Sequence, residues 1–511
     1  MPGAIGTPDL TTNVVTYEAF GAKGDGVTDD LPAICKAHEH ANQNSLPVRT
    51  KPDAAYHLGR QALTAIIATD TDWGTSKFII DDHKGVENYR RALFEVRSLL
   101  KSVPLQIDRL TKGQTHLDIQ VPVDCLVYVE NNNRKIFIRK GGNRNSGSNQ
   151  QEVFILRRNG SIEGGIDWDY GTITRVEAHP IDPKTLTLRG GVFTSIAVQT
   201  RQLKKGGQED FGYWSRNIKI SRSNTNVDGI THRITGEQNF GYPYMGFLSI
   251  HQCANIIIRN CVIDGRKVYQ KIGNAGTPVP MGTYGYHASC VMNLQMIKCR
   301  MENIHDRSRW GVSATNFMKN FLVKDCVLSR VDVHQGISGS YIIRGSTIGH
   351  GGINAIGKGK LMVENSSLHG GSIVMFREDF GSTWDGEVII RNCQWNPPRG
   401  NSVMFNMHND GSHDFGYPCS MPRVIRIDGL LVNDTKQPKN FQGITFFGKP
   451  GGSARDNRPF PYRLTEEIEI RGLKTASGIP PQISNHSELT KTIKVNSDSK
   501  LRSNLRNPSD P

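Results

Sequence analysis

The segments YIIRGSTIGH (341–350) and LMVENSSLHG (361–370) repeat one pattern, and this repeat decides the fold. In each, alternating apolar residues lead into a polar pair and a small residue, after which apolar residues resume. The same pattern is found in IIIRNCVIDG (256–265), FLVKDCVLSR (321–330) and VIIRNCQWN (388–396), with a shorter copy, MIKCRMENI, at 296–304. Such short strands cannot bury their apolar sides alone, so successive copies must stack on one another.

The small residue of each copy marks its phase. The markers are Cys261, Cys299, Cys326, Ser346, Ser366 and Cys393, and the successive gaps are 38, 27, 20, 20 and 27 residues. One coil of a β-helix takes about 20 residues or more, and longer gaps add loops on one face. An antiparallel β-sandwich would instead join its strands through tight hairpins. Repeats in one direction at matched phase therefore favour a parallel β-helix.

A second signal lies near the start of the chain. FGAKGDGVTDD, Phe20 to Asp30, precedes an amphipathic segment that predicts a helix from about Leu31, capped by Asp29 or Asp30. The segment resembles the opening of the pectate-lyase-like superfamily, which includes polysaccharide lyases, polygalacturonase-like hydrolases and phage tailspikes. The resemblance implies that this segment caps an otherwise open sheet edge. We therefore predict an all-β chain: a right-handed parallel β-helix with an N-terminal capping helix and a β-rich insertion.

The chain divides into four expected regions. Residues 1–83 form the cap and first coils, 84–215 a β-rich elaborated region, 216–478 the regular coils with the active groove, and 479–511 a polar tail. Within the second region, VYVENNNRKIFIRKG (127–141) predicts a hairpin that turns at Asn131–Asn133. The nine cysteines include no CxxC pair, so we expect small buried residues rather than zinc ligands.

Charge and composition limit the partners. The 62 Lys and Arg residues exceed the 48 Asp and Glu residues, giving a net charge of +14. A basic surface concentrates a polyanion such as nucleic acid, a uronic-acid polysaccharide or teichoic acid, unless the excess is simply spread over the molecule. We recognise no nucleic-acid-binding pattern, which favours an acidic polysaccharide over nucleic acid. We also expect no membrane insertion. No signal peptide is visible at the start, and we expect an extracellular or periplasmic protein or a virion appendage.

The distance of a residue from its marker predicts which side chains share a surface patch. Equivalent positions of successive coils lie about 4.8 Å apart. Eight residues past a marker lie Arg307, His334 and Asn354, and six residues past a marker lie His305 and Asp332. Alternate residues of a strand point the same way, so both sets are expected on one outward face. His350 and Arg377 of the following coils are expected beside them.

These residue types suit β-elimination on a uronate polymer of glycosaminoglycan-like character. Arg307 and Asn354 would hold the C6 carboxylate, while His334 removes the C5 proton. Asp332 would orient the imidazole, and Tyr286 or Tyr284 would protonate the leaving oxygen. Substrate contacts are predicted for His350, Arg309, Arg377, Trp310, Trp384, Tyr284 and His305. We predict a polysaccharide lyase that needs no metal or other cofactor.

Two alternatives remain open. A glycoside hydrolase of the same fold would use two carboxylates among Asp332, Asp379 and Asp385. GHG at Gly349–Gly351 is similar to one element of the polygalacturonase signature, but its paired-Asp and Arg-x-Lys elements are not recognisable. A tailspike-like appendage would bind polysaccharide with little catalysis and usually as a homotrimer, whereas a lyase could be a monomer. The plain alternative for the histidines is a hydrogen bond to a turn, and for the tryptophans it is packing.

Overall fold

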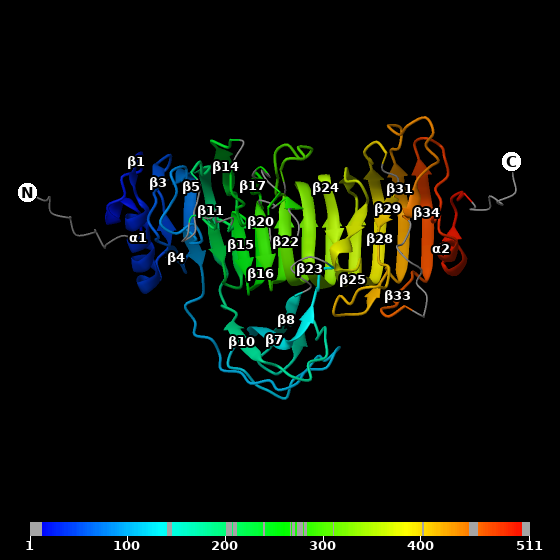
Figure 1. Ribbon diagram of the computed structural model, residues 1–511. Helices are drawn as coiled ribbons and strands as arrows, with labels where there is room; N and C mark the ends of the chain where they lie inside the picture. The colour runs from blue at the N-terminus through cyan, green and yellow to red at the C-terminus, as the bar shows by residue number, and fades with distance from the viewer. Residues whose placement is uncertain are drawn as a thin grey trace, which may run out of the picture.

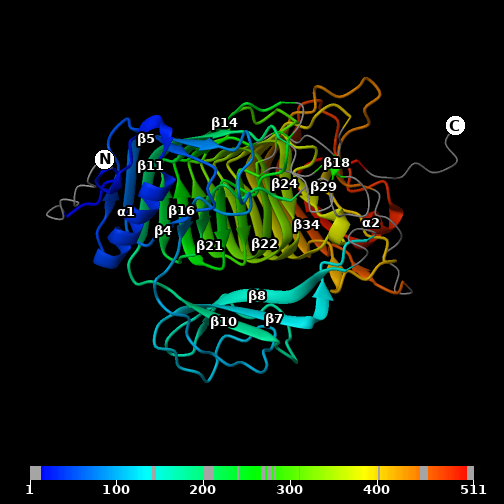
Figure 2. The same cartoon turned by 60° about the vertical axis from the view of Figure 1, so that its left-hand side comes forward.

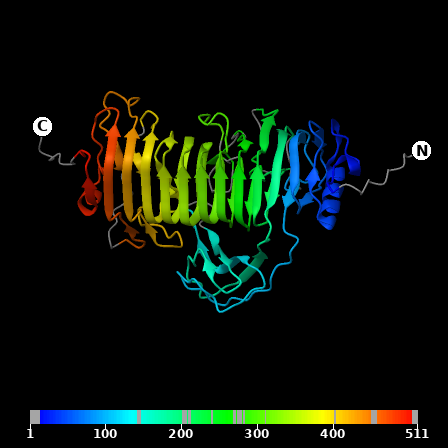
Figure 3. The ribbon, with the colours of Figure 1, turned by 180° about the vertical axis from the view of Figure 1, so that it is seen from behind.

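A computed structural model describes residues 13–140, 146–200, 207, 212–238, 241–265, 267, 271–272, 279–280, 284–309, 311–400, 403–448 and 458–502. The chain winds into a long solenoid of parallel strands, with the N-terminal cap at one end and the C-terminal cap at the other (Figures 1 and 3). The predicted right-handed parallel β-helix is confirmed.

The solenoid has three faces, named here sheets A, B and C. Sheet A contains β4 (Ala65–Ile67), β6 (Phe94–Val96), β12 (Ile218–Ile220), β15 (Leu248–His251), β20 (Tyr286–Ser289), the first part of β22 (Val312–Lys324), the middle of β23 (Val327–Arg344), the end of β24 (Thr347–Ala355), β27 (Val374–Phe376), β29 (Val403–Asn406) and β32 (Thr445–Phe447). This sheet carries the candidate site.

Sheets B and C complete each coil. Sheet B contains β2 (Val48–Arg49), the first parts of β5 (Thr71–Asp81) and β11 (Leu186–Ile196), β13 (Thr225–Asp228), β16 (Ala254–Arg259), β21 (Met292–Ile297), the ends of β22 and β23, β25 (Gly357–Glu364), β28 (Trp384–Trp395), β31 (Val424–Val432), β34 (Glu467–Thr475) and β35 (Lys494–Ser497). Sheet C contains β1 (Asp25–Asp29), β3 (Ala55–Leu58), β14 (Thr231–Thr235), β17 (Val262–Ile263), β26 (Ser367–Leu368) and the remaining parts of the long strands. Two short pairs lie outside the sheets: β18 (Lys271–Ile272) with β19 (Val279–Pro280), and β30 (Cys419–Ser420) with β33 (Tyr462–Arg463).

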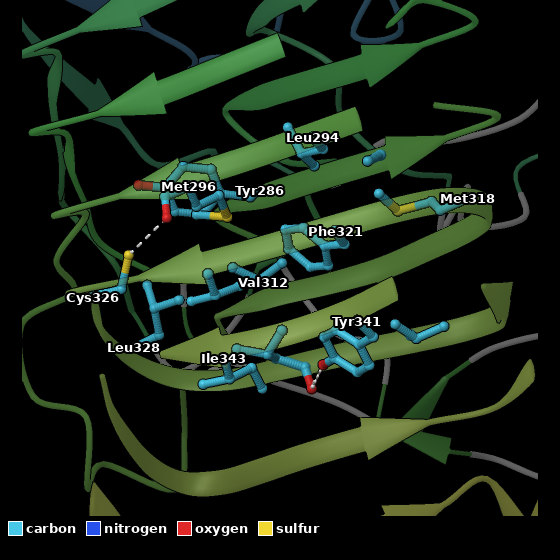
Figure 4. Packing of buried hydrophobic residues seen from close by; sticks show 14 of the residues in the cluster. Tyr286, Leu294, Met296, Val312, Met318, Phe321, Cys326, Leu328, Tyr341 and Ile343 are labelled. Carbon is cyan, nitrogen blue, oxygen red and sulfur yellow. Dashed lines mark hydrogen bonds between the residues drawn. The ribbon is translucent and has the colours of Figure 1, made fainter. Parts of the chain in front are cut away.

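The marker residues keep the phase that the sequence predicts. Each backbone N–H in this ladder reaches the side chain of the next coil: Cys299 to Cys326 Sγ at 3.3 Å, Cys326 to Ser346 Oγ at 3.0 Å, and Ser346 to Ser366 Oγ at 3.1 Å. Inside the solenoid, similar side chains of successive coils stack on one another. The rings of Phe321 and Tyr341 lie parallel, with centroids 5.8 Å apart (Figure 4). Eight of the nine cysteines are buried.

The helix α1 (Leu31–Asn44) covers the first coil (Figures 1 and 2). Its buried face includes Leu31 and Ile34. The buried carboxylate of Asp30 accepts the backbone N–H groups of Lys23 and Gly24 at 2.6 and 3.1 Å, which fixes the glycine-rich turn. Asp29 accepts the N–H of Leu31 at 3.2 Å. The predicted capping helix is confirmed.

The insertion forms an antiparallel sheet beneath the solenoid (Figure 2). Its strands, in spatial order, are β10 (Arg175–Pro180), β7 (Cys125–Ile136), β8 (Ser148–Leu156) and β9 (Ile162–Glu163). The structure differs from the expected boundaries, because β6 and β11 of region 84–215 belong to the solenoid. The predicted hairpin is wrong: β7 runs through the three asparagines, which form an irregularity between Asn131 and Lys135, and it pairs with β8.

The C-terminal region also differs from the expected polar tail. Helix α2 (Ser487–Thr492) and β35 lie over the last coil, because buried Leu489 and Ile493 close its apolar end. Residues 503–511 of that predicted tail lie outside the described residues. No helix in the described part of the chain is long and apolar enough to cross a membrane.

Candidate active site

One outward position of sheet A is polar from coil to coil. Strand pairing aligns Glu95, Lys219, Ser249 and His287 in neighbouring strands. Further along the sheet it aligns Asp332 with Asn354. Their sequence neighbours fill the interior, so these side chains point out of the solenoid. The sheet therefore forms the polar floor of a groove.

The far part of this floor carries a dense group of charges, named here the central cluster. It consists of Arg139, Arg330, Asp332, His334, Asn354, Arg377 and Asp379, which hydrogen bonds and ion pairs connect. Arg139 comes from the insertion, four residues come from β23 and β24, and the last two lie around the short helix η3 (Glu378–Phe380). Segments far apart in the sequence thus meet at one point.

Arg377 links the two carboxylates of the cluster. Its Nη1 lies 3.2 Å from Asp332, while its Nε and Nη2 lie 3.0 and 2.7 Å from Asp379. Arg330 Nη2 donates to Asp332 at 2.8 Å. With its amide oriented by its partners, Asn354 accepts from Arg330 at 2.7 and 2.9 Å. Asp332 is therefore held between two guanidinium groups.

His334 is a neutral imidazole with an accepting Nε2. Arg139 Nη2 lies 3.1 Å from this nitrogen. Because arginine only donates, Nε2 carries the lone pair and Nδ1 carries the proton. Burial lowers the pKa of His334 to about 3, and the positive charge of Arg377 acts in the same direction. The ring of Phe380 packs beside both groups, 5.3 Å from the imidazole and 4.9 Å from the guanidinium carbon of Arg139.

Asp379 is an ionised carboxylate. Burial acts to raise its pKa, but ion pairs with Arg377 and Arg139 bring the pKa below its ordinary value. Tyr284 lies near the cluster and stacks on Tyr213, with ring centroids 5.8 Å apart and an interplanar angle of 16°. Burial raises the pKa of Tyr284, so its phenol is protonated at neutral pH.

A basic groove lies on the same sheet A, nearer the N-terminal cap, and none of the residues of the central cluster lines it. It lies over β4, β6, β12 and β15 and encloses a cavity of about 700 Å³. Four cations line it: Arg90, Arg91, Arg97 and Lys219. His251 lines the groove, and its ring lies 4.8 Å from that of His287 on the neighbouring strand β20. Burial lowers the pKa of His287, and His251 and His334 contribute to the same shift.

Among the predicted site residues, the structure brings Asp332, His334, Asn354 and Arg377 together, with Tyr284 close by. The common outward direction of Asp332, His334 and Asn354 follows from the strand alternation that the sequence displays. The register is shifted, however: Asn354 pairs with Asp332 and not with His334.

The predicted position of Arg307 is wrong. Residues 301–309 form a loop ahead of β22, whose Val312 stacks beside Val331, and Arg307 is left exposed outside the sheet. His305, in the same loop, contacts the ring of His369 at 4.9 Å. His350 Nδ1 lies 3.0 Å from the carbonyl oxygen of Ile304.

Three other predicted residues do not join the cluster, and a fourth is not described. Arg309 forms an ion pair with Glu237 at 3.0 Å. Tyr286 and Trp384 point into the core, with 2% and 0% exposure, which does not fit contact with a substrate (Figure 4 for Tyr286). Tyr286 belongs to the inward row with Leu248 and Val312, and the outward residue of its strand is His287. Trp310 lies outside the described residues.

The sequence analysis missed Arg139, Arg330 and His287 and gave Asp379 only to the hydrolase alternative. Arg330 lies two residues before Asp332 on one strand, so the alternation rule could have found it. Arg139 is 195 residues from His334 in the sequence, and no repeat links the two. Among the described residues, no group of three or more His, Cys, Asp and Glu side chains is placed to hold a metal ion.

Comparisons with known proteins agree with this architecture. No protein-family profile matches the chain. A stretch of 93 residues is 34% identical to a depolymerase, capsule KL64-specific, of Klebsiella phage P510, covering 16% of this chain and 9% of that protein. The aligned stretch is thus a small part of the curated relative.

Two solved structures are similar over most of the chain. The tailspike protein gp49 from Pseudomonas phage LKA1 matches with a TM-score of 0.52 and 12% identity over 94% of this chain and 84% of that one. The gp54 tailspike of Acinetobacter baumannii bacteriophage AP22, solved with a capsular saccharide, matches with a TM-score of 0.39 and 10% identity over 91% and 76%. The chain therefore shares the right-handed parallel β-helix fold with the phage LKA1 tailspike.

Proposed function

We propose that the chain is a polysaccharide depolymerase of the phage-tailspike type, which works outside the cell on an acidic capsular polysaccharide. One observation carries the proposal: sheet A bears both a cation-lined groove and a cluster that holds a neutral imidazole beside two arginines. Such a groove attracts a polyanion. The phage P510 relative, described as a capsule-specific depolymerase, and the tailspike fold of the LKA1 protein support the same class.

The chemistry that we propose is β-elimination at a uronate residue. Arg377 and Arg139 bind the C6 carboxylate, and this neutralisation makes the C5 proton more acidic. His334 Nε2 takes that proton, and the electron pair forms a C4–C5 double bond as the C4–O bond breaks. The departing oxygen receives a proton from the neutral phenol of Tyr284. No oxidant or reductant is needed, since the proton and the electron pair are both accounted for.

The hydrogen bond from Arg139 to His334 makes proton abstraction depend on substrate binding. Arg139 occupies the lone pair that must accept the proton, at 3.1 Å. A bound carboxylate would draw Arg139 away and free Nε2. It would also offset the charges of Arg377 and Arg139, both of which lower the pKa of His334, so that the imidazole becomes a stronger base. The base is thus activated by the substrate group that the reaction requires.

Hydrolysis is the second candidate because Asp332 and Asp379 lie on opposite sides of the Arg377 guanidinium group. Two carboxylates that flank a glycosidic bond are the usual hydrolase arrangement. One of them must carry a proton to protonate the leaving oxygen. Ion pairs lower the pKa of Asp379, and Asp332 faces both Arg330 and Arg377. These surroundings keep both groups ionised and favour elimination over hydrolysis.

A panel of acidic capsular polysaccharides tests the proposal. Elimination products carry a C4–C5 double bond that absorbs in the ultraviolet, so absorbance should rise with wild-type protein on at least one polymer. His334→Ala should lower that rate by about 10²–10⁴-fold. His350→Ala, which changes a histidine bonded to a loop carbonyl, is the matched control and should keep the wild-type rate. New reducing ends without absorbance, or binding without cleavage, would refute the elimination mechanism.

A further inference from the structure

A second cavity lies between the insertion and the solenoid. Its volume is about 120 Å³, close to the roughly 150 Å³ of an apolar cavity that accepts benzene. The enclosed space is therefore smaller than a whole hexopyranose, and a bound sugar would place one side of its ring inside and the rest at the mouth. The insertion contributes Trp168 and Phe137, the solenoid contributes Phe317 and Lys358, and a later loop contributes Tyr417.

Aromatic rings form much of the wall. Trp168 is half-buried, and its ring centroid lies 6.0 Å from that of Tyr417, at 41°. Phe137 lies 5.0 Å from Tyr417 and 5.5 Å from Phe317. The C–H face of a pyranose is apolar and packs against such rings, while its hydroxyls need polar partners at the edge.

Most of the charges in the polar wall are paired. Lys319 Nζ lies 2.9 Å from Glu152 and 3.2 Å from Asp167, and Lys358 Nζ lies 2.8 Å from Asp167. Ser338 donates to Asp167 at 2.7 Å. With Lys112, Arg463 and Asp385 included, four cations and three carboxylates line this cavity, against four cations and one carboxylate in the basic groove.

The mouth of the cavity carries one hydrogen-bond acceptor of negative charge and one donor of positive charge. Asp385 and Arg463 lie there, 3.8 Å apart, and both side chains are largely exposed. Donors and acceptors side by side suit the hydroxyl groups of an uncharged sugar, each of which donates and accepts.

Phe137 separates this cavity from the central cluster. On one side its ring contacts Tyr417, and on the other it contacts Phe380, at 5.8 Å. Phe380 in turn packs against His334. A ligand in the cavity is therefore bound without touching the groups proposed for cleavage.

We infer that this cavity is an accessory carbohydrate site that binds one uncharged pyranose residue against Trp168 and Tyr417. The site goes beyond the proposed cleavage reaction. It would let the protein bind the neutral sugars of a polymer whose acidic residues occupy the basic groove.

Saturation-transfer NMR on the full chain tests this site with uncharged methyl pyranosides: glucoside, galactoside, mannoside and N-acetylglucosaminide. At least one should bind, and Trp168→Ala should weaken that binding about tenfold, the value of one aromatic contact. Leu99→Ala, at an exposed position before the insertion's sheet, is the control and should bind as wild type does. Arg377→Ala should also retain binding, which separates this site from the cleavage proposal.

Circular dichroism checks that each variant folds. If Trp168→Ala fails to fold, Asp385→Ala at the mouth replaces it and should weaken the same binding. Absence of transfer to every pyranoside in the panel would overturn the inference. Full binding by a folded Trp168→Ala variant would overturn it as well.

Discussion

Replacing Arg139 by alanine tests whether the inserted subdomain takes part in the chemistry. The Arg139 guanidinium contacts His334 at 3.1 Å and pairs with Asp379, and its side chain is 22% exposed. In the variant, Asp379 keeps its ion pair with Arg377 at 2.7 Å. Because a partly exposed ion pair contributes little, the free energy of unfolding should fall by only about 1 kcal/mol.

The expected effect on catalysis is much larger. Removal of one preorganised donor to developing charge costs about 10²–10³ in kcat/KM, or roughly 3–4 kcal/mol of transition-state stabilisation. The variant should also change the pH profile. Arg139 contributes to the lowered pKa of His334, so that pKa should rise in the variant. Activity requires the neutral imidazole, and its loss on acidification should therefore begin at a higher pH.

Initial rates from ultraviolet absorbance and urea unfolding curves measure both quantities. Arg134→Ala, an exposed arginine of the same insertion, is the matched control and should match wild type in both. Arg139→Lys should recover part of the rate, because a cation is restored without the planar fork. If Arg139→Ala keeps its rate within about threefold of wild type, the guanidinium does not act on the transition state.

Three further perturbations follow from the same geometry. Arg97→Ala should raise KM for the polymer, leave kcat unchanged and make KM less dependent on salt; an unchanged KM at low salt would show that the basic groove does not bind the polymer. Burial lowers the pKa of His38 to about 3, so unfolding free energy should fall by up to about 1.4 kcal/mol per pH unit below pH 6.5, and His38→Gln should flatten that slope in urea titrations. Asn293→Ala breaks side-chain hydrogen bonds to Asn255 and Asn320 at 3.0 and 2.9 Å and places alanine at a φ of 59°, so it should cost about 1–3 kcal/mol in urea unfolding; no loss would show that these asparagine hydrogen bonds add no stability.

The repeat was sufficient to predict the solenoid because its signal is local. Each marker lies two residues past a position such as Lys324, Arg344 or Glu364, and these positions pair in the structure. The insertion was harder to predict, since antiparallel strands can pair in many ways. β7 looked like two strands because its polar irregularity at Asn131–Lys135 has the composition of a turn.

The candidate site was predicted in part for a similar reason. Asp332, His334 and Asn354 lie on strands, where alternation fixes the side-chain direction. Arg307 lies in a loop, where a count from the marker does not give a position in space. Arg139 reaches the site through tertiary packing of the insertion, which no periodicity in the sequence records.

A crystal structure of the His334→Ala variant with an oligosaccharide from a cleaved acidic capsule tests the central claim most directly. The account predicts a uronate carboxylate between Arg139 and Arg377, with the chain continuing over β15 and β12 toward Arg97. A saccharide bound on sheet B or C, with the groove of sheet A empty, would contradict it.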